Sequence, residues 1–359
     1  SASLTLSDLS GNFVASWDAD RIIFAEKPRN NEPLRLGLSG TTARLISSDA
    51  NAQNAVLAVA PRAGRSTRVS RRAALKIAGW SIGAIGATAI VVWVLIPLLS
   101  AQLARQTPEP VKSRIGSATL AQITKLIAYL PGETEQAQYC HGRDGLDAFG
   151  TMTGRILAGM INRPEIRLVV LDAKLVNAFA LPGGYIVATS GLIETAKSAE
   201  EVAGVIAHEI GHVHHQHPTQ AIYSTTAVSV LISGIIGDFS GGVLITGIAE
   251  WALNSSYSRN NERDADRFAI SRLNAAGIDG HGLGRFFARL TEQSKDKSDR
   301  SILRFLSSHP PSDERMALIR DTGSGGGKVL DASEWKALRQ VCEVTGHRPA
   351  RFPVIPAGQ

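Results

Sequence analysis

The sequence predicts an α+β protein that is mainly helical with a small sheet, preceded by one transmembrane helix and a small β-rich N-terminal domain. Three observations support this prediction. Residues 1–60 alternate apolar and polar side chains in short runs separated by Gly, Asn and Pro, which is typical of strands and turns. Residues 77–104 contain no ionisable side chain. Beyond them, apolar residues recur at helical spacing around two short strand-like runs.

Charge and cysteine content exclude some classes of protein. The 359 residues include 38 Lys and Arg against 32 Asp and Glu, and the basic residues form no stripe interleaved with aromatics. We therefore expect no nucleic-acid partner. Cys140 and Cys342 are too few for a disulfide scaffold and lack metal-ligand spacing. They can form one bridge if their compartment is oxidising.

The N-terminal domain, residues 1–60, contains runs such as "FVASW" and "LRLGL" but no histidine or cysteine. This composition favours packing or partner binding over catalysis, and the sequence does not identify the partner. Residues 61–76 form a basic linker that carries five arginines and one lysine.

The apolar run "IAGWSIGAIGATAIVVWVLIPLL" contains 23 residues, and a helix needs about 20 to cross a bilayer. We expect a membrane span at 77–100. Because the more basic flank stays cytoplasmic, the prediction is a single-pass inner (plasma) membrane protein with a cytoplasmic N-terminus and an extracytoplasmic remainder. Two alternatives stay open, namely a buried soluble helix and an export signal formed by "SRRAALK" and "SAQLA".

The region after the span predicts helices over 116–130 and 144–161. Strand-like runs over 166–173 and 185–196 then bracket "KLVNAFALPGG", in which Pro182-Gly183-Gly184 indicates a turn. Together these elements predict a small sheet covered by helices.

A helix follows over "SAEEVAGVIAHEIGHVHHQH", where Ser198 and Glu201 have capping-box spacing. Its apolar periodicity predicts an end at Pro218. Residues 221–253 are apolar but interrupted by Asp238 and a glycine pair, so they predict either buried or interface-lying helices or a second membrane hairpin. "NNERDADRFAISRLNAAG" predicts a further helix.

His208 and His212 share one helix face because they are four residues apart, and Glu209 lies beside the first. This His-Glu-x-x-His spacing predicts two ligands to one Zn²⁺ with a carboxylate next to the remaining coordination position. His215 is displaced along the axis by about 7 Å, too far for a bond to the same ion. We expect His214, His215 and His217 to form a solvated helix end.

A third ligand is required, and the downstream acidic helix offers Glu262. Asp266 lies on the same face of that helix and can accept a hydrogen bond from a ligand imidazole. Asp264 projects away from this face, so we expect it at the surface.

The motifs "HEIGH", "NERDAD", "NAFALPGG" and "SSHPPSDER", in this order, resemble the gluzincin family that includes HtpX, the CAAX prenyl proteases, mitochondrial Oma and periplasmic BepA-like peptidases. The resemblance covers about residues 115–320. It implies a zincin-type metallopeptidase domain over 105–322 and leaves a C-terminal extension over 323–359. The N-terminal region is not covered. A single span before the peptidase differs from the multi-span members and favours the envelope-facing branch.

The resemblance also implies roles for single residues. One Zn²⁺ per chain would be held by His208, His212 and Glu262, with Glu209 as general base. His309 would either stabilise the oxyanion or occupy the open metal position. Apart from the resemblance, we expect Arg259, just before the acidic helix, and Arg315 to pair with carboxylates for structural reasons. The edge strand along which a peptide substrate adds would comprise Asn177, Ala178, Phe179 and Ala180.

The expected function is therefore a membrane-anchored zinc endopeptidase that acts on unfolded or misassembled proteins, with membrane lipid as its other partner. Two alternatives belong to other classes. One is a latent or pseudo-protease that acts as a chaperone-like assembly factor, against which the intact Glu209 argues. The other is a metal-dependent regulatory module in which the N-terminal domain does the main work.

Overall fold

The computed structural model divides into two compact units, Ser1–Ala87 and Thr88–Gln359, which are treated separately. The residues that the structure describes are 2–8, 10–25, 32–49, 51–60, 63, 71–130, 133, 136–236, 257–295, 300–347 and 353–358.

The first unit is rich in strands, in line with its alternating sequence pattern. It consists of the hairpin β1 (Ser3–Ser7) and β2 (Phe13–Asp18), the antiparallel sheet β3 (Ile22–Phe24), β4 (Leu34–Leu38) and β5 (Arg44–Ser47), and the helix α1 (Ala52–Val59). Trp17, Ile22 and Leu36 are buried together in its core.

One continuous apolar helix connects the two units along the chain. It is formed by α2 (Arg71–Ile90), a π-helical turn (Val91–Leu95) and α3 (Ile96–Gln106). Among the described residues, the stretch Arg72–Gln106 is the one helix that is long and apolar enough to cross a membrane, judged by length and composition. Trp80 and Trp93 on this helix are exposed.

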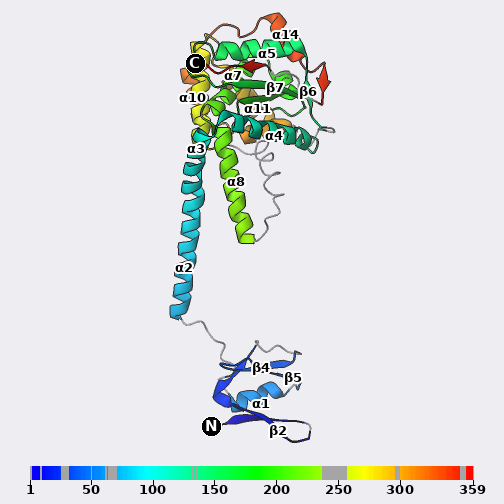
Figure 1. Cartoon of the computed structure of the whole chain (residues 1–359), viewed down its shortest axis with the longest axis vertical. Helices are drawn as coiled ribbons and strands as arrows, with labels where there is room; N and C mark the ends of the chain where they lie inside the picture. The colour runs from blue at the N-terminus through cyan, green and yellow to red at the C-terminus, as the bar shows by residue number, and fades with distance from the viewer. Residues whose placement is uncertain are drawn as a thin grey trace. The chain divides into compact units, whose positions relative to one another are not determined.

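The second unit is built on a six-stranded sheet (Figure 1). Its strands, in the order β10-β6-β7-β9-β8 with β11 also on β7, are β6 (Gln138–Cys140), β7 (Ile166–Asp172), β8 (Ala178–Leu181), β9 (Tyr185–Thr189), β10 (Thr345–Gly346) and β11 (Val354–Ile355). β7 and β9 are parallel, and β8 pairs antiparallel with β9. β8 is the last strand in this order, so its outer edge has no strand partner among the described residues.

The turn between β8 and β9 requires glycine. Gly183 and Gly184 have φ angles of 74° and 76°, in the left-handed region. A Cβ on Gly184 would also lie 1.9 Å from the carbonyl oxygen of Glu165. The turn therefore fixes where the edge strand ends.

Helices cover both faces of this sheet. α4 (Glu109–Ile127) packs on one face through Ile123 and Ile127, against strand residues such as Val169 and Val187. The other face packs against the larger core, which is formed mainly by α5 (Arg143–Ile156), α7 (Ala199–His214), α10 (Arg259–Ala275), α11 (Gly282–Ser294), α12 (Arg300–Ser308) and α13 (Asp313–Thr322). The expectation of a mainly helical α+β fold with a small sheet is confirmed.

Two predicted element boundaries were wrong. The strand that begins at Tyr185 ends at Thr189, whose side chain caps the short helix α6 (Ser190–Thr195). The histidine-bearing helix ends at His214 rather than at Pro218, because Gln216 has a φ of 60° and breaks it. A new helix, α8 (His217–Ile236), begins directly afterwards. Of the ambiguous segment, residues 237–253 lie outside the described residues.

Residues after 322 join the same sheet. α14 (Ala332–Arg339) packs on α5, and β10 and β11 pair antiparallel with β6 and β7. A disulfide bond joins Cys140 on β6 to Cys342 beyond α14.

Candidate metal centre

The helix α7 carries His208 and His212 into the interior of the second unit. Its N-terminus is capped by Ser198, whose hydroxyl accepts a hydrogen bond from the Glu201 backbone N–H at 3.4 Å. Gly211 lets α10 approach closely, since a Cβ there would lie 2.9 Å from the Ala265 backbone. The two helices can therefore bring side chains from distant parts of the sequence together.

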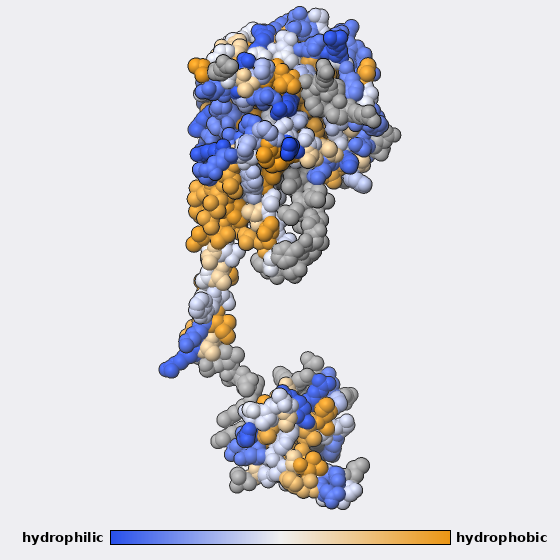
Figure 2. All heavy atoms as spheres, in the orientation of Figure 1, coloured by the Kyte–Doolittle hydropathy of each residue, from blue (hydrophilic) through white to orange (hydrophobic). Residues whose placement is uncertain are grey.

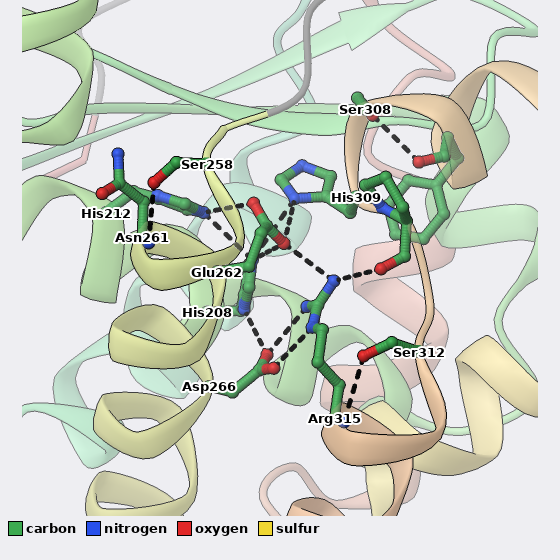
Figure 3. A network of polar contacts seen from close by, with 12 residues as sticks. His208, His212, Ser258, Asn261, Glu262, Asp266, Ser308, His309, Ser312 and Arg315 are labelled. Atoms are coloured by element: carbon green, nitrogen blue, oxygen red, sulfur yellow. Dashed lines mark hydrogen bonds and ion pairs between the residues drawn. The ribbon is translucent and has the colours of Figure 1, made fainter. Parts of the chain in front are cut away.

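His208, His212 and Glu262 converge between these helices (Figure 3). The two Nε2 atoms lie 3.0 Å apart. Glu262 places Oε2 3.5 Å from Nε2 of His208 and Oε1 3.4 Å from Nε2 of His212. All three side chains are buried. The structure thus brings together the three residues that the sequence predicts as ligands.

Asp266 holds His208 in this orientation. Its Oδ1 lies 2.8 Å from Nδ1 of His208, which leaves Nε2 of that ring facing the other candidate ligands. Arg315 on α13 donates two hydrogen bonds to Asp266, at 2.6 Å and 2.9 Å, and lies 2.8 Å from Glu262. The predicted pairing of Arg315 with carboxylates is confirmed.

His217 occupies the corresponding place beside His212, and sequence reasoning missed it. Its Nδ1 lies 3.0 Å from Nδ1 of His212, and the side chain is buried rather than solvated. The break at Gln216 turns His217 back toward the preceding helix. Tyr257, also not singled out from the sequence, stacks on the His212 ring at a centroid distance of 4.0 Å.

Glu209 and His309 complete the cluster. One ligand atom from each of His208, Glu209, His212 and His309 lies within 4.8 Å of the others. His309, at the end of α12, places Nε2 3.4 Å from Glu209 and Nδ1 3.3 Å from Glu262. Figure 3 shows its ring directed toward Glu262.

Burial and neighbouring charges shift the pKa values of these groups when no metal ion is bound. Burial opposes protonation of His208, but Asp266 and Glu262 outweigh it and raise the pKa of His208 to about 10. Burial also raises the pKa of Glu209, against the opposing effect of His309. For Glu262 burial is outweighed by His309, His208 and His212, which hold the pKa of this carboxyl well below its usual range.

The donor set fits a zinc ion. Two imidazoles and a carboxylate are ligands that Zn²⁺ takes in catalytic sites, with a fourth position left for water or substrate. Oε1 of Glu262 and both carboxylate oxygens of Glu209 are buried with no hydrogen-bond partner among the described residues. Buried carboxylate oxygens without partners are costly, and a cation between the histidines would offset that cost.

The predicted edge strand lies beside this cluster, because α7 packs against β8. Ala178, Phe179 and Ala180 belong to β8, and Asn177 directly precedes it. Asn177 is buried, and neither polar atom of its side-chain amide has a partner in the part of the chain that the structure describes. Asp264, as expected, lies outside the cluster with a partly exposed side chain, and its carboxylate is 3.9 Å from Arg267.

Comparisons with known proteins agree with this geometry. A model of peptidase family M48 matches residues 152–322, which include every residue of the cluster. Metalloprotease LoiP of Escherichia coli K12 is 33% identical over 49% of this chain and 70% of its own length. Metalloprotease YcaL of the same organism is 33% identical over 48% of this chain and 68% of its own.

The similarity to larger relatives is partial. A beta-barrel assembly-enhancing protease of Yersinia pestis is 28% identical over 48% of this chain, but the match covers only 37% of that protein. A homologue in Vibrio cholerae is matched over 36% of its length.

Proposed function

The chain belongs to peptidase family M48, and from this premise we propose that it is a zinc-dependent endopeptidase anchored in the inner membrane, with its peptidase domain on the extracytoplasmic side. The observation that carries the proposal is the convergence of His208, His212 and Glu262 with Glu209 in one buried cluster. The proposed organisation is an N-terminal domain over 1–60, a span over 77–100 and a peptidase domain over 105–322.

His208, His212 and Glu262 would hold the zinc. Zn²⁺ bound there supplies Lewis acidity that polarises a peptide carbonyl and makes water more acidic. Glu209 accepts the proton from the attacking water and returns it to the leaving amine. Burial raises the pKa of Glu209, which helps this carboxyl to carry a proton between the two steps.

Of the two predicted roles of His309, we assign to it the one in which it occupies the open metal position and closes the site. Its ring contacts both Glu209 and Glu262, so in this arrangement it takes up space beside the general base. Displacement of the His309 loop would open the site to substrate.

The substrate is proposed to be an extended polypeptide. The outer edge of β8 can accept a peptide as an added strand through main-chain hydrogen bonds, a mode with little side-chain selectivity. The side-chain amide of Asn177, which has no hydrogen-bond partner among the described residues, is suited to the same main chain. Unfolded or misassembled proteins present such segments, and the name of the Yersinia relative refers to β-barrel assembly.

The location rests on two features. The basic linker 61–76 precedes the apolar helix and favours a cytoplasmic N-terminus. The disulfide between Cys140 and Cys342 favours an oxidising compartment for the peptidase domain.

The test is casein cleavage by the purified full chain together with its zinc content. We expect one zinc per chain and cleavage that a chelator abolishes and added Zn²⁺ restores. Glu209→Gln should keep the zinc and lose cleavage. A Glu209→Gln variant that cleaves casein at the original rate would refute the proposal.

A further inference from the structure

The helix that follows the histidine helix, α8, has an apolar far end that is exposed among the residues that the structure describes. Val230, Leu231 and Ile232 are 49%, 39% and 48% exposed. After His217, no Asp, Glu, Lys, Arg or His occurs up to Ile236. A helix at the surface of a soluble domain normally presents charged residues outward. This surface therefore requires an apolar partner.

α8 packs alongside α3, the last part of the candidate membrane helix (Figure 1). The hydroxyl groups of Thr107, directly after α3, and Tyr223 on α8 are hydrogen-bonded at 2.8 Å. Leu98, Leu99 and Leu103 on α3 are also exposed. Figure 2 shows hydrophobic side chains gathered over both helices in this region.

α3 and α8 extend equally far from the hydrogen bond between Thr107 and Tyr223. Leu98 lies nine residues before Thr107, and Ile232 lies nine residues after Tyr223. At about 1.5 Å per residue, each is about 14 Å from the bond, so Ile232 is level with Leu98, which lies inside the proposed span over 77–100. Tyrosine is enriched where a membrane meets water, so Tyr223 suits the headgroup region next to that span.

We propose that residues 224–234 of α8 insert into the extracytoplasmic leaflet of the bilayer beside α3, with lipid hydrocarbon as the partner of their exposed face. The inference rests on the membrane anchoring in the proposed function and not on the proteolytic activity. α8 begins three residues after α7 ends, so two membrane contacts would hold the metal centre close to the bilayer surface. Polypeptides at that surface would then be the accessible substrates.

The test places a fluorescent probe on the full chain reconstituted into vesicles of phosphatidylethanolamine and phosphatidylglycerol. The native cysteines are bridged, so without reductant an environment-sensitive NBD label attaches only to an introduced thiol. The probe position is Ile232→Cys. Leu98→Cys reports on α3, and Ile161→Cys, an exposed apolar residue elsewhere in the same unit, is the matched control.

We expect NBD at positions 232 and 98 to emit with the blue shift of an apolar environment. Lipids with a nitroxide on the acyl chain should quench both, and should leave position 161 unchanged. Quenching at 98 without quenching at 232 would overturn the inference while leaving the anchor intact. A blue shift at 232 that acyl-chain nitroxides do not quench would also overturn it, because a protein surface would then cover α8. No quenching at 98 would refute the anchoring itself.

Discussion

Gly211→Ala tests whether close packing of α7 on α10 assembles the metal centre. The new methyl carbon would lie 2.9 Å from both Cα and O of Ala265, and these backbone atoms cannot rotate away. Overpacking of this kind costs about 1–3 kcal/mol, whereas replacing a helical glycine by alanine gains about 0.5–1 kcal/mol. The midpoints of these two ranges give an expected net loss of about 1 kcal/mol in the free energy of unfolding.

The same displacement should weaken zinc binding, because Glu262 lies on α10 and both histidines lie on α7. If the whole loss of about 1 kcal/mol destabilises the zinc-bound site, zinc affinity decreases by about 5-fold. Urea unfolding followed by circular dichroism and zinc competition with a chromophoric chelator measure the two effects.

Gly154→Ala is the matched control. Gly154 also lies within a helix, α5, but a Cβ there meets nothing within 4 Å. We expect it to stabilise the protein by about 0.5–1 kcal/mol and to leave zinc affinity unchanged. If both variants are equally stabilised and bind zinc equally well, the packing argument is refuted.

Three further predictions concern the surroundings of the site. His217→Ala removes the partner of Nδ1 of His212 and should lower zinc affinity by about 10- to 100-fold, whereas the exposed His347→Ala should not. His309→Ala should raise the rate of casein cleavage at unchanged zinc content, and a lower rate would favour the oxyanion role instead. Loss of the disulfide in Cys342→Ser opens a loop of 202 residues and should cost about 2–5 kcal/mol in urea unfolding, while an unchanged midpoint would show that the bridge does not form.

Local sequence patterns predicted the parts of the fold that depend on neighbours along the chain. The four-residue spacing of His208 and His212 and the cap at Ser198 both follow from helix geometry, and the structure has them in place. The turn before β9 could be predicted because its φ angles are positive. Glycine adopts such angles at little cost, whereas other residues are disfavoured there.

Features set by contacts far apart in the sequence could not be predicted in this way. His217 is buried because Gln216, a residue with no turn preference, adopts a positive φ. β10 and β11 contain two residues each, too few for a periodic pattern. The bridging of Cys140 and Cys342 depends on a pairing across 202 residues, so the sequence left it open. The acidic helix downstream suggested Glu262 as the third ligand, and the family resemblance made this assignment specific, because no fixed spacing links Glu262 to the two histidines.

Zinc K-edge absorption of the purified full chain tests whether His208, His212 and Glu262 bind one ion. We expect one zinc per chain with nitrogen and oxygen neighbours at about 2.0–2.2 Å and no sulfur. In Glu262→Ala the carboxylate neighbour should be lost and zinc affinity should fall. An unchanged spectrum and affinity in Glu262→Ala would contradict the claim that His208, His212 and Glu262 together bind the ion.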